Sequence, residues 1–189
     1  MYRRDTPAIQ RGRYREFYQC DYDVAGSYAC MMPETEVLKV GCEILGSLNI
    51  GGFMIKLNHR VLLDATLANA GVPAAKFRTI CSSIDKLDKE PWADVKAEMV
   101  HEKGLAEAVA DKIGVFVQMA DRPRALLASL RDSELATDER AVQAFNELEL
   151  LFNYLDAVGC LDHISFDLSL ARGLDYYTGV IYEAVLTCA

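Results

Sequence analysis

The chain has 189 residues, of which 51% are hydrophobic and 25% are charged, and its formal net charge at pH 7 is −8. This composition is typical of a folded globular protein and excludes a disordered or collagen-like chain. The length allows one large domain, or one domain that carries an insert, with a core large enough to need no disulfide bonds. The acidic balance also argues against a general polyanion-binding protein.

The sequence contains no apolar stretch near the ~18 residues that a membrane span needs, and its first residues lack the apolar core of a signal peptide. Its six cysteines include no C-x-x-C pair and no histidine at ligand spacing, so we expect no metal site. Reduced thiols favour a cytoplasmic location, with an organellar form left open. No membrane partner is expected.

Residues 1–16 differ from the rest of the chain in charge. They hold five arginines against two acidic residues, a net charge of +3, while the remainder carries −11. A short arginine-rich stretch suits a small anion such as a nucleotide better than a long nucleic-acid track. A solvated basic terminus would have the same composition, and charge alone favours that simpler interpretation.

The segment 13–24 is rich in aromatic residues and lacks proline and glycine, which favours a strand. In a strand, Phe17, Gln19 and Asp23 would share one face because side chains alternate with a period of two. Such a face could line a polar ligand cleft. A solvated outer face would look similar, and for a single strand it is the commoner case.

The spacing of apolar residues predicts a helix over 34–48, a short buried strand over 53–57 and a second helix over 60–70. From residue 73 to residue 159 the pattern is helical throughout. Its last helix is expected over about 138–157 with Thr137 as the N-cap.

Strand character returns at 164–170 and 180–186, on either side of a polar loop that contains two glycines. This arrangement suggests an antiparallel pair. The helical block therefore interrupts a sheet, and the fold class expected is α+β. The loop and the N-terminal segment are the two polar regions. Their guanidinium, carboxylate and phenol groups would suit a zwitterionic amino acid beside a nucleotide.

Two runs of residues resemble one family. The run from Tyr2 to Gln19 resembles motif 2 of class II aminoacyl-tRNA synthetases, in the form found in eukaryotic histidyl-tRNA synthetases. The run Leu-Ala-Arg-Gly-Leu-Asp-Tyr-Tyr-Thr-Gly at 170–179 resembles the histidine-specific signature of that family, and 77–83 also looks familial. The two runs occur in the family's order with a helical insert between them, so the resemblance covers essentially the whole chain.

The resemblance implies part of a class II antiparallel sheet with flanking helices, interrupted by a helical insertion domain. It assigns 1–72 to the first part of the catalytic core, 73–160 to the insertion and 161–189 to the second part of the core. The implied activity is ATP-dependent activation of histidine and its transfer to the tRNA for histidine, by an enzyme that is a homodimer. ATP would be a substrate and would bring Mg²⁺.

The resemblance also implies roles for ATP-binding and catalytic residues. Arg3 would hold the α-phosphate of ATP and the carboxylate of histidine. Phe17 would stack on adenine. Arg172 would approach the carboxylate and the α-phosphate from the opposite side, so that both arginines neutralise charge during in-line attack.

The histidine pocket is implied by a second group of residues. Gln19 and Asp23 would receive the α-amino group, and Tyr176 and Tyr177 would shape and bond the imidazole pocket. Motif 1, the second histidine signature, motif 3 and an anticodon-binding domain are not found. We therefore expect an internal catalytic-domain fragment that cannot charge tRNA alone.

Two other interpretations stay open. A synthetase-like regulatory module could sense histidine or uncharged tRNA without catalysis, although the retained Arg3, Gln19, Asp23 and Arg172 favour the enzyme. A generic helical interaction protein would leave both motifs unexplained.

Overall fold

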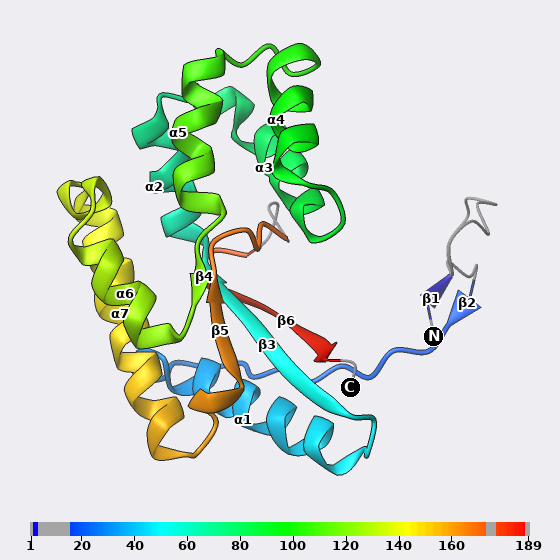
Figure 1. Ribbon diagram of the computed structural model, residues 1–189. Coiled ribbons are helices and arrows are strands. Elements are labelled where there is room, and N and C mark those ends of the chain that lie inside the picture. Colours follow the sequence, from blue (N-terminus) through cyan, green and yellow to red (C-terminus); the bar gives the residue numbers. More distant parts are fainter. Residues whose placement is uncertain (1, 4–15, 173–176, 188–189) are drawn as a thin grey trace.

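The structure is a computed structural model that describes residues 16–172 and 177–187, and the backbone alone of residues 2–3. A central sheet has helices packed along it, and a separate group of helices lies at one end (Figure 1). The chain is thus a mixed α and β protein, as the expected α+β class requires. None of the described helices is both long enough and apolar enough to cross a membrane.

The main sheet has four strands in the order β4 (Ala120–Asp121), β5 (Ile164–Asp167), β3 (Gly52–His59) and β6 (Val180–Thr187). Strand β3 pairs in parallel with β5 and antiparallel with β6. The expectation that the two last strands pair with each other is therefore wrong, because β3 lies between them. The long connection between β5 and β6 allows this, since only a tight turn forces neighbouring strands to pair.

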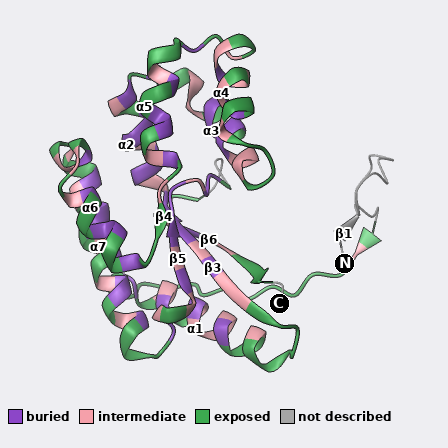
Figure 2. Cartoon of the chain, viewed as in Figure 1, coloured by how far each residue is buried: buried purple, intermediate pink, exposed green. Residues whose placement is uncertain are grey.

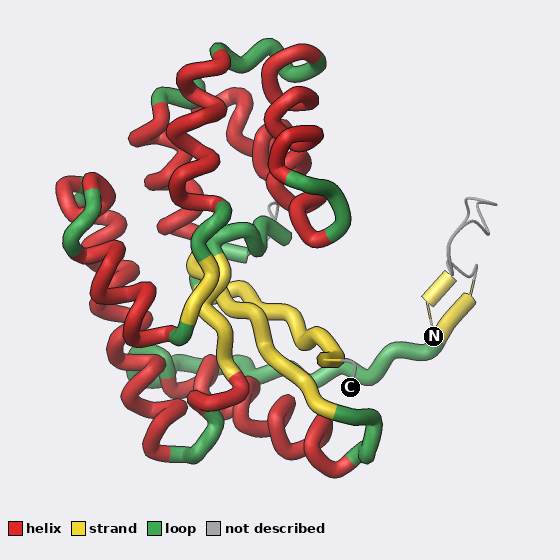
Figure 3. The backbone as a smooth tube through the Cα atoms, viewed as in Figure 1, coloured by secondary structure: helices red, strands yellow, loops and turns green. Residues whose placement is uncertain are grey.

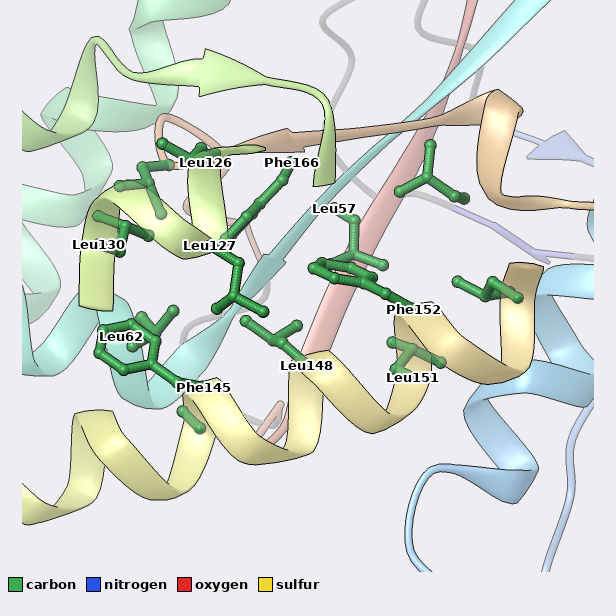
Figure 4. Packing of buried hydrophobic residues seen from close by; sticks show 14 of the residues in the cluster. Leu57, Leu62, Leu126, Leu127, Leu130, Phe145, Leu148, Leu151, Phe152 and Phe166 are labelled. Carbon is green, nitrogen blue, oxygen red and sulfur yellow. The ribbon is translucent and has the colours of Figure 1, made fainter. Parts of the chain in front are cut away.

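One face of this sheet is covered by α1 (Met32–Ser47), α6 (Pro123–Arg131) and α7 (Glu139–Ala157). Strand residues Ile55, Leu57 and Phe166 point into this core, and Phe152 of α7 meets Phe166 edge-on at 5.9 Å between ring centroids. Figure 4 shows how the side chains of α6 and α7 pack under the strands. We call this apolar cluster the sheet core.

A second apolar cluster, which we call the helical core, lies among α2 (Arg60–Ala70), α3 (Phe77–Ile84), α4 (Trp92–His101) and α5 (Glu107–Val117). Helix α4 approaches α5 closely at Gly114, where a Cβ atom would collide with the ring of Trp92. The helices expected as one block over 73–160 are thus shared between two cores. The division of the chain at residues 72 and 160 stays a prediction.

Helix ends follow local hydrogen bonds. Helix α2 ends at Gly71, whose φ of 90° is the left-handed conformation that glycine adopts without strain. Asp138, not Thr137, is the N-cap of α7, because its Oδ1 accepts the backbone N–H of Arg140 at 2.9 Å. Thr137 instead donates its hydroxyl to the carbonyl of Glu134, in the 3-10 turn Glu134–Thr137.

The N-terminal segment differs most from the expectation. Strands β1 (Tyr2–Arg3) and β2 (Glu16–Phe17) form a separate two-stranded sheet, apart from the main sheet in Figure 3. Residues 18–25 form no strand and are exposed (Figure 2), so the strand expected to reach residue 24 is wrong beyond Phe17. A strand needs a hydrogen-bonded neighbour, and no described segment pairs with these residues.

Candidate active site

A cavity of about 320 Å³ lies between the N-terminal segment, the beginning of α1 and strand β6. Asp23 and Tyr177 both line it, although Asp23 follows the first motif segment and Tyr177 belongs to the second, near the opposite end of the sequence. The cavity is also lined by Tyr22, Val24, Pro33, Glu34, Val37, Val180, Ile181 and Tyr182. Its polar groups are therefore two carboxylates and three phenols, a set suited to a small ligand that carries a cationic group.

Glu34 is a lining residue that the sequence did not single out. It lies in the first turn of α1, where an acidic residue is common because it complements the helix dipole. Its Oε2 is buried and has no hydrogen-bond partner among the described residues. A buried carboxylate oxygen without a donor costs free energy, so Glu34 offers an acceptor for a ligand. The ordinary helix-start pattern explains why no sequence signal distinguished it.

Tyr182 is the second lining residue without a sequence signal, since it lies within the strand pattern of β6. Its partial burial, and then the proximity of Tyr177 and of Glu34, raise the pKa of its hydroxyl. The phenol therefore stays protonated at neutral pH and can donate a hydrogen bond into the cavity.

The other residues expected around histidine and ATP either do not line this cavity or have side chains that the structure does not describe. Gln19 is exposed, and Phe17 lies half-buried in β2; neither lines the cavity. Arg3 lies opposite Glu16 in the register of β1 and β2, with only its backbone described. Tyr176 lies outside the described residues.

Arg172 lies in an ionic cluster and is not among the lining residues of the cavity. Its Nη1 donates to Oε1 of Glu183 at 2.6 Å, and its Nε lies 3.5 Å from Oδ1 of Asp85. Lys56, the cross-strand partner of Glu183, is bound to Asp88 at 2.6 Å. Asp167 lies 3.4 Å from the same ammonium group and completes the cluster.

The cluster lies on the face of the sheet away from the sheet core. Lys56 of β3 alternates with Ile55 and Leu57, which both point into that core. The structure therefore places one pair of expected site residues, Asp23 and Tyr177, in a cavity, and places Arg172 in a separate cluster of charged groups. No group of three or more His, Cys, Asp or Glu side chains within the described ranges is arranged to hold a metal ion.

Comparison with known proteins identifies the family. The family model for histidyl-tRNA synthetase matches residues 2–189. The cytoplasmic histidine–tRNA ligase of Dictyostelium discoideum is 57% identical over 188 residues, which are 99% of this chain and 39% of the relative. The mitochondrial histidine–tRNA ligase of Homo sapiens is 54% identical over 186 residues, 98% of this chain and 37% of the relative.

Solved structures agree. The crystal structure of histidyl-tRNA synthetase from Nostoc sp. PCC 7120 matches with a TM-score of 0.77 and 28% identity, over 84% of this chain and 37% of that one. The chain thus spans less than two fifths of the length of these relatives. The sequence match covers both motif segments and the helices between them, and the structural match has the class II fold. The chain therefore belongs to the histidyl-tRNA synthetase family.

Proposed function

We propose that this chain forms part of the catalytic domain of a histidine–tRNA ligase, which activates histidine with ATP and transfers it to the tRNA for histidine. The observation that carries the proposal is the cavity to which Asp23 and Tyr177 both contribute. An Asp23 carboxylate would accept hydrogen bonds from the α-amino group, and the phenols of Tyr176 and Tyr177 would bond the imidazole. The resemblance gives Gln19 a share in binding the α-amino group, although Gln19 does not line the cavity in the structure.

In the proposed reaction, a carboxylate oxygen of histidine attacks the α-phosphorus of ATP, and the bond to the β-phosphate oxygen breaks to release pyrophosphate. By the roles that the resemblance implies, Arg3 and Arg172 would neutralise the charge that develops, and Phe17 would stack on the adenine, although Arg172 and Phe17 do not line the cavity in this structure. Mg²⁺ would arrive bound to the ATP phosphates and screen their charge. A ribose hydroxyl of the tRNA then attacks the acyl carbonyl and gives up its proton, and the bond between the acyl carbon and the phosphate oxygen breaks to release AMP.

We also propose that the enzyme is a homodimer in the cytoplasm, as expected in the sequence analysis. The relatives named above include cytoplasmic and mitochondrial ligases. A fluorescent fusion of the full-length protein would distinguish the two compartments.

A chimera tests the activity directly. The segment of the Dictyostelium ligase that aligns with this chain is replaced by residues 1–189, and histidine-dependent ATP–pyrophosphate exchange is measured. We expect exchange that requires histidine and is not supported by other amino acids. Histidine binding without any exchange would instead favour the regulatory module that senses histidine, and an intact chimera that does neither would overturn the proposal.

A further inference from the structure

Three elements of the chain meet at the guanidinium of Arg172, and one of them is distant in sequence. Arg172 itself follows β5, Glu183 belongs to β6, and Asp85 begins the 3-10 helix η2 (Asp85–Asp88) of the helical block. An arginine side chain has many rotamers when it is free, and two carboxylates on different nitrogen atoms select among them. The two contacts therefore favour one guanidinium orientation.

The position of the Glu183 carboxylate is defined by the sheet. Glu183 is fixed by the register of β6 with β3, where its cross-strand partner is Lys56. Its Oε2 is buried and accepts no hydrogen bond from the described residues. A buried carboxylate oxygen that accepts no hydrogen bond can accept a second N–H of the same guanidinium. Arg172 and Glu183 can therefore form a bidentate ion pair.

A second ion pair anchors η2 to the same face of the sheet. Asp88, the last residue of η2, binds the Lys56 ammonium group at 2.6 Å, and that ammonium group also lies 3.4 Å from Asp167. Asp85 and Asp88 thus attach one short helix to two neighbouring points, Arg172 and Lys56. The residue before Arg172 is also held by the helical block, because Ala171 is 1% exposed within the helical core.

We propose that Asp85 and Glu183 are positioning residues for Arg172, and that the helical block thereby controls the orientation of this arginine. The inference rests on the proposed function and deepens it. The two contacts use Nε and Nη1, and about half of the side chain, 47%, stays exposed. Since a guanidinium has five N–H donors, it can bind an anionic substrate while both carboxylates hold it.

Kinetics of the chimera test the proposal, with Asp88→Asn as the matched control. Asp88 lies on the same turn as Asp85 but binds Lys56, so Asp88→Asn removes one attachment of η2 and leaves both carboxylate contacts of Arg172 in place. We expect Asp85→Asn and Glu183→Gln to lower the kcat of ATP–pyrophosphate exchange by about tenfold or more, because misplacing a reacting group by a fraction of an ångström has effects of this order. The KM for histidine should change less than about twofold, since both carboxylates act on the arginine and not on bound histidine. The thermal midpoint of Asp85→Asn should match that of Asp88→Asn.

A second measurement does not depend on catalysis. In the 189-residue chain with isotope-labelled arginine, the Nε–H resonance of Arg172, assigned by its loss in Arg172→Lys, should shift in Asp85→Asn and in Glu183→Gln but not in Asp88→Asn. Equal effects of Asp85→Asn and Asp88→Asn on kcat and on this resonance would overturn the positioning role. An unsubstituted chimera without exchange would refute the proposed function alone, and the resonance would still decide whether the two carboxylates hold Arg172.

Discussion

The sheet core and the helical core are built from different elements but share α2. Leu62 of α2 packs into the sheet core, whereas Leu63 and Leu67 pack into the helical core. The two cores also differ in the segments that pack against them. The sheet core supports the strands, while the helical core includes Ala171, immediately before Arg172. The comparison indicates that the chain immediately before Arg172 is held by the helical core, in which Ala171 is buried.

The largest effect on stability is expected from a substitution that creates a cavity in the sheet core. Phe152 is fully buried there and contacts Phe166. Phe152→Ala should lower the free energy of unfolding by about 3–5 kcal/mol, because it removes a large apolar side chain and leaves a cavity. Urea denaturation followed by circular dichroism measures this loss. A change below about 1 kcal/mol would show that α7 does not support the sheet as described.

A substitution that creates a cavity in the helical core tests whether the two cores are separate units. Met99 of α4 is fully buried among α2, α3 and α5. Met99→Ala should cost about 2–5 kcal/mol and increase hydrogen exchange in α3–α5 more than in α6 and α7. Uniformly faster exchange from residue 73 to residue 160 would instead support a single insertion unit with the boundaries expected from the sequence.

The junction of the two cores is expected to respond to pH. His59 lies between β3 and α2, with its Nε2 at 3.1 Å from Glu147 and its Nδ1 accepting the N–H of Val61. Burial lowers the pKa of His59, despite the opposing effect of Glu147 and Glu34. In the unfolded chain the imidazole has its ordinary pKa of about 6.5 and binds a proton that the folded chain excludes.

The contribution of His59 to stability is therefore complete above about pH 6.5 and is lost as the pH falls below that value. His59→Asn removes this titration and retains an N-cap acceptor for α2. The difference in free energy of unfolding between the two proteins should narrow or reverse from pH 7 toward pH 5. A difference that widens on acidification would contradict a buried neutral imidazole.

The smallest effect is expected at the beginning of α7. Asp138→Ala removes the N-cap acceptor and should cost about 1 kcal/mol, whereas Thr137→Ala should cost less because Thr137 bonds only the preceding turn. Thermal denaturation of both variants measures the difference. A greater loss of stability from Thr137→Ala than from Asp138→Ala would show that Thr137 is the N-cap of α7.

Local patterns predicted some parts of the molecule well. The helix over 60–70 has the expected bounds, because an apolar stripe and Gly71 define it locally. The strand over 53–57 is longer and includes Asn58 and His59, since its pairing with β6 extends it. Which strands are neighbours could not be predicted, because pairing depends on contacts distant in sequence.

Residues of the candidate site could be predicted only where the family resemblance assigned them a role. The resemblance singled out Asp23, Tyr177 and Arg172. Glu34, Tyr182, Asp85 and Glu183 have no local signal, since each fits an ordinary helix or strand pattern. Their importance depends on which segments meet in space, and that meeting is visible only in the fold.

The most direct test of the central claim is the effect of Asp23→Asn in the chimera on the two substrates. A charge-assisted bond to the α-amino group contributes about 1.5–3 kcal/mol, so the KM for histidine in pyrophosphate exchange should rise by about ten- to a hundredfold. The KM for ATP should change less than about twofold. Asp21→Asn is the control, because Asp21 is a neighbouring exposed carboxylate that does not line the cavity. An equal rise in both KM values, or the same rise from Asp21→Asn, would contradict the placement of histidine in this cavity.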